Sequence, residues 1–428
     1  MIDLPLLHPI PSAEFHCPAC QIKLMVHGWH MPGMRQLADL ECPQCHRTYY
    51  GDLPSGHGLF YPALLQRETG EIVSNPTNWF SDFLHKSYAS RQTHSLKINF
   101  EQFRPIHKPA LLNCLEGIYG HSIEKILNSQ YYLDHSDYDL ILVVPRYLAW
   151  MIPQGVAAMW VVDAPLRLLG EWHEAIHTEI EAFIRQFPQC HLIPSLPEIS
   201  PQHYQIERFT GIRPFQLADW HQQAPQVSVI WRQDKRLWAW RIDTLSAKAQ
   251  RLTQLHLLKR PPYLEMQRQL VQRLCQQLSQ QHIQVNLLGL GQYGDFSPWA
   301  NDHRVERPDD ATERTWLTLC AQSHVVISVH GSHLLLPSAH AGAVIDLMPD
   351  DRWGNIAQDI IHSPEQTPRE AMARYHYLPL RSTPEQVAQR ALLLIQSLPM
   401  MLGSFRAEFN QLEQIKDWSS IRKVYRQA

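Results

Sequence analysis

The sequence predicts an α/β protein in which two Rossmann-like domains follow a small zinc ribbon. Two Cys-x-x-Cys pairs lie within the first 45 residues, a pattern typical of a metal-binding ribbon. Two later series alternate short apolar runs with amphipathic stretches, as parallel strands and their crossover helices do. The hydrophobic fraction of 44% and the charged fraction of 18% allow a real core, and 428 residues suit two or three domains.

These observations divide the chain into five expected segments. The junction between the two α/β series falls near residue 222, and the second series ends near residue 400. The segments are a zinc ribbon over 1–60, a connector packed on the body over 61–107, an N-terminal Rossmann-like domain over 108–222, a C-terminal Rossmann-like domain over 223–400 and a C-terminal helical segment over 401–428.

The expected metal ligands are the four cysteines of the ribbon, Cys17, Cys20, Cys42 and Cys45. Each pair brings two thiolates to one ion, and two pairs complete a tetrahedron. Cysteine fills all four positions, which leaves none for a water, so the zinc is expected to be structural. A redox Cys-x-x-Cys or a chance pairing is the alternative. The ribbon is also a candidate site for a protein partner.

Charge and hydropathy disfavour several classes of protein. The 38 basic and 41 acidic residues give a net charge of −3, and the basic residues of the ribbon form no dense stripe, so nucleic acid is not an expected partner. No run of about 18 apolar residues predicts a transmembrane helix. The N-terminus lacks a basic segment and is broken by prolines, which argues against a signal peptide and for a cytoplasmic protein.

The first α/β series begins with an apolar run that predicts a strand. A helix is expected after it, with Ser122 as a candidate N-cap. A longer amphipathic helix is expected over 166–187. Strands are expected over residues 110–114, 140–144, 156–162 and 190–193. This order predicts a mainly parallel sheet.

The second series repeats the alternation from residue 227 onward. Helices are expected over 263–280, 313–321 and 332–341, and a last one begins near Pro384 after a hydroxyl cap. Strands are expected over 227–231, 285–288, 325–329, 343–347 and 377–380. Doubly wound sheets bind ligands at the carboxyl ends of their strands, so a cleft between two such domains would bring two substrates together.

A candidate ligand site follows the strand over 325–329, in the stretch Ser-Val-His-Gly-Ser-His-Leu over 328–334. The strand ends at Gly331 and a helix is expected at once. Backbone N–H groups at such a helix start favour phosphate, and a glycine lets the backbone approach a ligand closely. An ordinary strand–turn–helix with a satisfied histidine is the alternative.

This stretch resembles the C-terminal signature of family 61-type glycosyltransferases. In that signature a strand ends in His-Gly-Ala-Gly-Leu, and a later apolar strand closes with Glu and Pro. The matching positions are His330, Gly331 and Leu334. The departures are Ser332 and His333, where Ala and Gly are usual, and Asp346, which stands for the Glu. The specific match covers about 25 residues, and the two-domain layout is a looser likeness.

The resemblance implies a GT-B fold with an acceptor-binding N-terminal domain and a nucleotide-sugar-binding C-terminal domain. It implies transfer of a sugar from a nucleotide-diphosphate donor to a hydroxyl of a glycan, lipid or protein acceptor, without an essential metal. Basic side chains after the first strand of the C-terminal domain would neutralise the departing diphosphate. The expected donor-binding residues are Arg232, Lys235, Arg236, Gly289, Gly291, Tyr293, His330, Gly331, Ser332 and Asp346.

Two further groups of residues complete the expected site. The loop Gly-Leu-Gly-Gln-Tyr-Gly over 289–294 has the shape of a dinucleotide fingerprint, but no helix follows it directly, so it is expected to line the donor pocket with Tyr293 stacking on a base. Glu116 or His121, in the turn after the first strand, is the expected general base. Their position alone supports this role, and a capping or core role is the favoured alternative for His121.

A second interpretation places the protein in another functional class. The body could be a degenerate, non-catalytic transferase fold that binds a nucleotide, a glycan or a protein. The bulk of His333 in the signature and the lack of a clearly identified base favour that reading.

Overall fold

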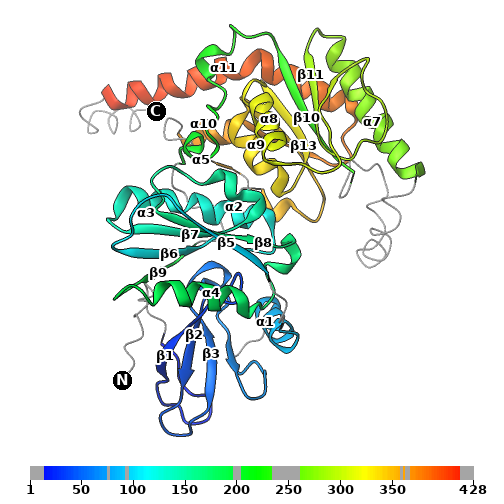
Figure 1. Cartoon of the computed structure of the whole chain (residues 1–428). Helices are drawn as coiled ribbons and strands as arrows, with labels where there is room; N and C mark the ends of the chain where they lie inside the picture. Colours follow the sequence, from blue (N-terminus) through cyan, green and yellow to red (C-terminus); the bar gives the residue numbers. More distant parts are fainter. Residues whose placement is uncertain are drawn as a thin grey trace, which may run out of the picture. The chain divides into compact units, whose positions relative to one another are not determined.

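The computed structural model describes residues 14–74, 78–91, 96–195, 204–233, 261–356, 360–361 and 367–414. The chain divides into two compact units (Figure 1). Unit 1 comprises Met1–Tyr204 with Arg208–Gly211, and unit 2 comprises Gln205–Glu207 with Ile212–Ala428. Each unit has its own central sheet, which is mainly parallel in unit 1 and wholly parallel in unit 2 among the described residues.

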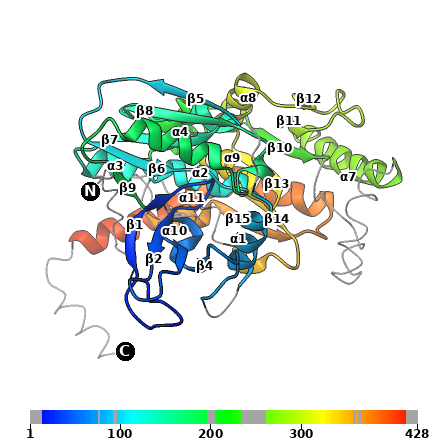
Figure 2. The same ribbon diagram turned by 60° about the horizontal axis from the view of Figure 1, so that its bottom comes forward.

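Unit 1 begins with an antiparallel sheet of four strands in the order β1-β2-β3-β4 (blue in Figures 1 and 2). The strands are β1 (Met25–His30), β2 (Leu37–Glu41), β3 (Thr48–Asp52) and β4 (Leu64–Gln66). A short 3₁₀ helix, η1 (Gly56–Leu59), lies between β3 and β4. The ribbon sheet therefore continues past the predicted limit at residue 60, because β4 pairs with β3.

The ribbon is packed on the rest of unit 1. Cys17, Leu40 and Tyr49 share one hydrophobic core with residues of the central sheet. A buried ion pair joins Arg35 to Asp52 at 2.7 Å, and the Arg35 guanidinium lies 3.5 Å from the centre of the Phe80 ring. These contacts make the ribbon part of a larger compact unit.

The central sheet of unit 1 has five strands in the order β5-β8-β7-β6-β9. All pairs are parallel except β5 with β8. The strands are β5 (Lys97–Gln102), β6 (Pro109–Asn113), β7 (Asp139–Pro145), β8 (Ala158–Asp163) and β9 (His191–Ile193). This confirms the mainly parallel sheet. It also corrects the predicted connector over 61–107, because β5 is an edge strand of the sheet.

Helices cover both faces of this sheet, with α2 and α3 on one face and α4 on the other (Figure 1). The α-helices are α1 (Trp79–Ala89), α2 (Tyr119–Leu127), α3 (Ser129–His135), α4 (Glu174–Ile184) and α5 (Ile206–Thr210). Further 3₁₀ turns are η2 (Arg146–Met151) and η3 (Leu166–Leu168). Ser122 lies inside α2 and donates to the Glu116 carbonyl, so its predicted N-cap role is wrong; Ile118 is the N-cap.

Unit 2 has one six-stranded parallel sheet in the order β12-β11-β10-β13-β14-β15. The strands are β10 (Gln226–Arg232), β11 (Gln284–Leu290), β12 (Asn301–Asp302), β13 (Val325–Val329), β14 (Ala343–Met348) and β15 (Tyr375–Pro379). In chain order this is 3-2-1-4-5-6, the order of dinucleotide-binding doubly wound sheets. The prediction of a Rossmann-like second half is confirmed at the level of topology.

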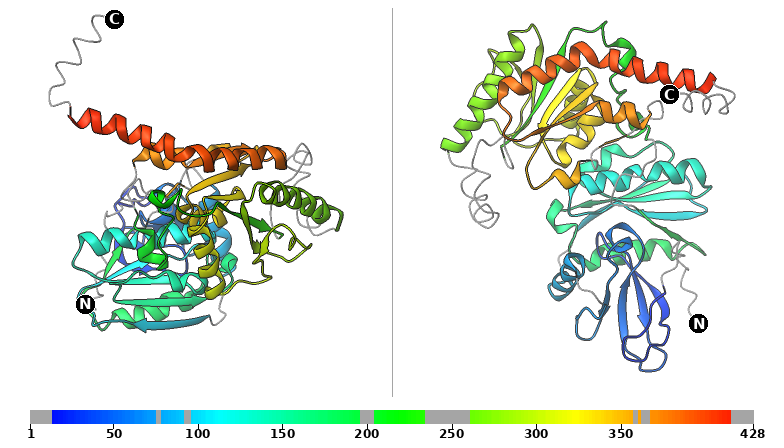
Figure 3. Two further views of the ribbon diagram at one scale, coloured as in Figure 1. Left: turned by 90° about the horizontal axis from the view of Figure 1, so that it is seen from above. Right: turned by 180° about the vertical axis from the view of Figure 1, so that it is seen from behind.

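Two layers of helices enclose the second sheet (Figure 3). Side chains of α7 and α11 form one core with β10, β13 and β14, and residues around α8, α9 and α10 form another on the opposite face. The α-helices are α7 (Pro261–Ser279), α8 (Asp310–Ala321), α9 (Leu335–His340), α10 (Pro368–Ala373) and α11 (Pro384–Gln414). The 3₁₀ turns are η4 (Leu217–Asp219), η6 (Ser332–Leu334) and η7 (Trp353–Asn355).

Two predicted boundaries of the second domain need correction. The segment before residue 222 belongs to unit 2, because the Phe215 N–H donates to the His340 carbonyl and the Trp220 indole donates to the Ile395 carbonyl. At the other end, α11 runs without a break through residue 400, so the described part of the expected C-terminal segment continues that helix. In the described parts of the chain, no helix combines the length and apolarity needed to cross a membrane.

Candidate functional site

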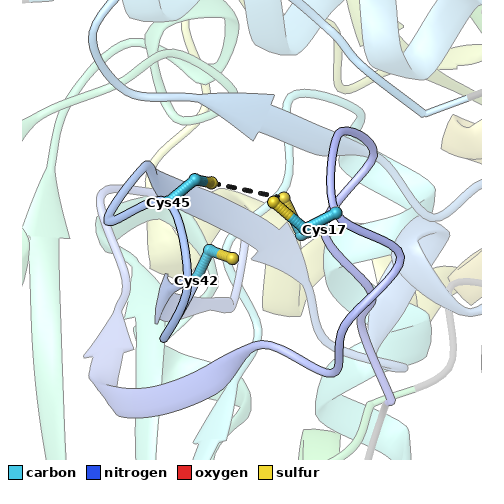
Figure 4. Close-up of side chains that lie close together, drawn as sticks. Cys17, Cys42 and Cys45 are labelled. Carbon is cyan, nitrogen blue, oxygen red and sulfur yellow. Dashed lines mark hydrogen bonds between the residues drawn. The ribbon is translucent and has the colours of Figure 1, made fainter.

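The four ribbon cysteines form one cluster. Their sulfur atoms all lie within 4.8 Å of one another, and Cys17 Sγ is 3.7 Å from Cys45 Sγ (Figure 4). A tetrahedral zinc site with Zn–S bonds of about 2.3 Å has sulfur atoms about 3.8 Å apart. The donor set and its spacing therefore fit a zinc ion.

The two Cys-x-x-Cys turns have the same backbone geometry. Cys17 accepts a hydrogen bond from the Gln21 N–H, and Cys42 accepts one from the His46 N–H, each through its carbonyl. Gln21 and His46 both have a φ of 57°. A non-glycine residue rarely adopts this conformation, so its repetition at equivalent positions marks two matched Cys-x-x-Cys turns. The exposed His46 side chain hydrogen-bonds Glu41 and lies outside the cysteine cluster.

The environment of Cys17 favours its thiolate. Burial opposes ionisation of this thiol, but hydrogen bonds from the Tyr49 hydroxyl and the backbone N–H groups of Cys20 and Ala19 outweigh burial and lower its pKa to about 6. Donors that stabilise a thiolate also serve a thiolate bound to a cation.

The carboxyl ends of β10 and β13 form the switch point of the unit 2 sheet, where strand order reverses. In doubly wound sheets ligands bind at this place. Arg232 is the last residue of β10, while His330 and Gly331 directly follow β13. The parallel pairing of β10 with β13 thus places Arg232 at the same sheet edge as His330 and Gly331, which come about one hundred positions later in the sequence.

His330 is held by a buried carboxylate. Its Nδ1 lies 2.7 Å from Asp346 Oδ2, and the two side chains are 7% and 1% exposed. Burial raises the pKa of Asp346, and the contact with His330 opposes that rise. In the part of the chain that the structure describes, Asp346 Oδ1 has no hydrogen-bond partner. Asp346 lies inside β14, and its carboxylate is placed to orient the imidazole of His330.

The turn after β13 explains two of the sequence departures. Gly331 has a φ of 150°, and a Cβ there would lie 3.2 Å from His333 Nδ1. The His333 Nε2 lies 2.8 Å from the Ser328 hydroxyl, so the ring folds back onto the strand. Ser332 begins η6 and is half-buried. The bulk of His333 is thus packed against the turn.

The glycine-rich loop after β11 is shaped by its contacts. A Cβ on Gly289 would lie 2.0 Å from the Trp231 carbonyl oxygen, and one on Gly291 would lie 2.4 Å from the Gln233 side chain. Both glycines also have positive φ values. Tyr293 donates its hydroxyl to Glu265 and packs against the core. The loop follows β11 beside β10, and packing accounts for each of these residues.

Two predicted donor-binding residues, Lys235 and Arg236, fall outside the described residues. A small cavity lies near the end of β10. A cavity of about 30 Å³ between α7 and the sheet is lined by Val229, Trp231 and Gln267, among others. Gln267 is fully buried, and neither of its amide atoms has a partner among the residues that the structure describes. A cavity of this volume can admit water.

In unit 1, the predicted base Glu116 forms a buried ion pair with Lys125. Its Oε2 lies 2.9 Å from Lys125 Nζ, with the side chains 4% and 1% exposed, and its Oε1 accepts from the Gly117 N–H. Burial alone would raise the pKa of Glu116, but the charge and hydrogen bond of Lys125, together with the nearby His57 and His121, outweigh burial and lower the pKa. The residue is therefore an ionised carboxylate of low basicity.

His121 has the geometry of an oriented base. Its Nδ1 lies 2.8 Å from Glu124 Oε2, and its side chain is 23% exposed. When Nδ1 carries the proton and donates to Glu124, Nε2 is the basic nitrogen. His57 packs at right angles against it, with ring centroids 5.0 Å apart. Burial, with the nearby charges of His121 and Lys125, lowers the pKa of His57 to about 4 despite Glu116.

Sequence reasoning missed the side chains that surround the predicted base. His57, Glu124 and Lys125 come from the ribbon and from α2, and the cluster depends on contacts between segments that are far apart in sequence. Glu124 and Lys125 are adjacent charged residues of a helix, and such residues are usually exposed to solvent. Both are buried here.

Comparisons with known proteins give weak likenesses only. No protein-family model matches the sequence, and no curated protein matches it. The ADP-heptose LPS heptosyltransferase II of E. coli is 11% identical, with 67% of this chain and 98% of that chain covered and a TM-score of 0.38. The dodecameric iron-containing heptosyltransferase TibC in complex with ADP-D-beta-D-heptose is 12% identical over 62% and 64% of the two chains, with a TM-score of 0.32.

The glycosyltransferase SnogD from Streptomyces nogalater is 12% identical. The match covers 68% of this chain and 79% of the SnogD chain, with a TM-score of 0.21. Likeness at these levels assigns neither a family nor an activity. The resemblance to family 61 likewise stays a prediction.

Proposed function

We propose that the chain is a GT-B-like glycosyltransferase that moves a sugar from a nucleotide-diphosphate donor to an acceptor hydroxyl. The observation that carries this proposal is the meeting of Arg232, His330 and Gly331 at the switch point of a sheet with the 3-2-1-4-5-6 order. A guanidinium cation, an imidazole and a glycine backbone at the carboxyl ends of parallel strands suit the binding of a diphosphate.

Unit 2 would hold the donor. The Arg232 guanidinium offers two parallel donors to phosphate oxygens, and the backbone after His330 can approach them closely because Gly331 has no side chain. Asp346 would fix the orientation of the imidazole of His330 through the contact at Nδ1. These groups stabilise the charge that develops on the departing diphosphate, where electrostatic contributions to catalysis are largest. Charge neutralisation by side chains supports chemistry without an essential divalent metal.

His121 in unit 1 is the better candidate for the general base. The acceptor oxygen bonds to the anomeric carbon, the bond from that carbon to the diphosphate oxygen breaks, and the base takes the hydroxyl proton. Glu116 is buried, paired with Lys125 and weakly basic. His121 is partly exposed, and Glu124 orients it.

The ribbon would bind one structural zinc ion. Cys17, Cys20, Cys42 and Cys45 would ligate it as thiolates, and the ion supplies folding energy and no chemistry. A protein partner on the ribbon stays a prediction, for which the exposed Met25 and Val26 on the edge strand β1 offer a surface. A cytoplasmic location also stays a prediction.

Nucleotide titration tests the donor site. The full chain with its zinc is titrated calorimetrically with UDP, GDP, ADP and CMP, each separately. One of them is expected to bind with a Kd of about 1–100 μM, weakened at least about tenfold in Arg232→Ala. Arg273→Ala is the matched control, because Arg273 is an exposed cation of the same unit that pairs with Glu385. Equal binding by both variants would contradict the role of Arg232.

A non-catalytic binding protein is the second candidate. The observation in its favour is the position of His333, whose ring lies against the backbone of Gly331. It predicts nucleotide binding without turnover, so release of nucleoside diphosphate from any donor sugar would exclude it.

A further inference from the structure

A segment of the ribbon covers the switch point of the unit 1 sheet. The strand order places this point between β6 and β9, where Ser195 follows β9. The Gly56 N–H donates to the Ser195 carbonyl at 2.6 Å, and the Ser195 N–H donates to the Ser55 hydroxyl at 3.0 Å. The residues that lead into η1 therefore lie at the place where a doubly wound sheet binds its ligand.

Close packing fixes this segment next to the candidate base. Gly56 has a φ of 57°, and a Cβ there would lie 3.2 Å from Lys125 Nζ. The next residue, His57, packs between His121 and Trp79, with ring centroids 5.0 and 5.2 Å away. The Nε2 of His57 is buried and has no hydrogen-bond partner in the described chain. A polar group of a ligand could supply this missing partner.

Exposed aromatic rings continue outward from His57. Phe60, Tyr61 and Trp79 are 49%, 40% and 54% exposed. Tyr61 lies 5.8 Å from Trp79 and 6.4 Å from Phe60, measured between ring centroids. We call these three residues the aromatic surface. Exposed rings of this size are costly to leave in water, and in groups they usually mark a binding site.

We propose that the aromatic surface binds the sugar rings of a glycan acceptor and that the zinc ribbon thereby forms one wall of the acceptor site. The inference rests on the proposed transferase function only in naming the glycan as an acceptor. Binding of the glycan itself does not require a donor nucleotide. A pyranose ring places C–H groups on an aromatic face, and its hydroxyl groups then reach the neighbouring imidazoles. His121, the partly exposed candidate base, stands at the inner end of the rings.

Chemistry favours a glycan over a lipid as the occupant. Pockets with flat aromatic walls and a few polar groups fit ligands that are apolar on one face and polar at the edge. An acyl chain requires a continuous apolar groove, but polar His57 and His121 bound the aromatic surface on its inner side. The nearest exposed charges on α1, Asp82 and Lys86, have opposite signs and offer no basic cluster for an anionic membrane.

The test uses the full chain with its zinc and no nucleotide. Chitotetraose, cellotetraose and maltotetraose are titrated separately, and binding is followed by ligand-observed NMR. At least one is expected to bind with a Kd of about 1 mM or tighter. Trp79→Ala is expected to weaken that binding at least about tenfold, and Tyr61→Ala about threefold, since each variant removes an aromatic face that packs on a sugar ring. Trp353→Ala is the control, because Trp353 is a similarly exposed tryptophan of unit 2.

Three outcomes would overturn the inference. They are no binding of any of the three tetrasaccharides, equal binding by wild type and Trp79→Ala, and Trp79-dependent binding to phosphatidylethanolamine–phosphatidylglycerol vesicles in place of the sugars. The nucleotide titration on the same preparation separates the two proposals. Nucleotide binding without glycan binding contradicts only the aromatic surface, and the reverse result contradicts only the donor site.

Discussion

The buried pair of Glu116 and Lys125 gives the sharpest prediction about stability. Lys125→Met keeps most of the side-chain volume but removes the charge, and it leaves the carboxylate of Glu116 buried without its partner. The Lys125 ammonium also donates to the Leu115 carbonyl at 2.9 Å, and this bond is lost as well. Breaking a buried pair by removing one partner typically costs about 3–5 kcal/mol.

The double variant Glu116→Gln/Lys125→Met separates charge from packing. Replacing both charges removes the uncompensated carboxylate, so most of the loss should be recovered, leaving about 1–2 kcal/mol. The pair Lys108–Asp137 is the matched control, because both side chains are more than half exposed. Lys108→Met should leave the unfolding midpoint unchanged.

The assay is urea unfolding followed by circular dichroism, with the transition of unit 2 as internal reference. A loss of less than about 1 kcal/mol in Lys125→Met, or a double variant as unstable as the single one, would refute the reasoning.

The pH dependence supplies a second check. Without Lys125, burial dominates and raises the pKa of Glu116 above its unfolded value. The folded variant then binds the extra proton, so its free energy of unfolding rises as pH falls toward the unfolded pKa. The difference from wild type should therefore shrink between pH 8 and pH 5.

Three further predictions concern the other sites. Asp346→Asn should lower turnover about tenfold or more by misdirecting His330, and steady-state assay beside a thermal melt would separate this from unfolding; unchanged turnover contradicts the orienting role. Cys20→Ser should reduce zinc from about one equivalent per chain and destabilise unit 1 by at least about 3 kcal/mol, measured by plasma mass spectrometry and urea unfolding; full zinc content would contradict the site. Burial lowers the pKa of His340 to about 4. The unfolded chain therefore binds this proton more readily, and the free energy of unfolding falls as pH falls from about 6.5 toward 4. His340→Gln should remove this contribution, which is up to about 1.4 kcal/mol per pH unit. An unaltered slope would contradict that assignment.

The elements that the sequence predicts well are those buried on both faces. The apolar run over 140–144 is a strand because a neighbouring strand pairs with it along each of its two edges. The run over 325–329 agrees with β13 at both ends. Parallel strands of this kind carry their pattern in the local sequence.

Tertiary contacts explain the main misses. The predicted helix over 166–187 begins only at Glu174, because the His173 N–H donates to the Pro32 carbonyl of the ribbon. The edge strand β5 was overlooked although Ile98 and Phe100 alternate with polar residues, which is the signal of a strand with one solvated face. Both features depend on a partner that the local sequence does not reveal.

The candidate site divides in the same way. The cysteine spacing predicts the cluster directly, because four thiolates at two turns have few other arrangements. The pairing of His330 with Asp346 requires the register between β13 and β14. The contact of His57 with His121 requires the docking of the ribbon on the sheet, and no local pattern encodes it.

The donor site in unit 2 can be examined in a crystal structure of the zinc-loaded chain with the nucleoside diphosphate that binds in solution. We expect the diphosphate at the carboxyl ends of β10 and β13, with oxygens within hydrogen-bond distance of the Arg232 guanidinium and the Gly331 N–H. A nucleotide bound anywhere else, or one whose phosphates do not contact these two residues, would contradict the proposal that unit 2 is the donor domain of a glycosyltransferase.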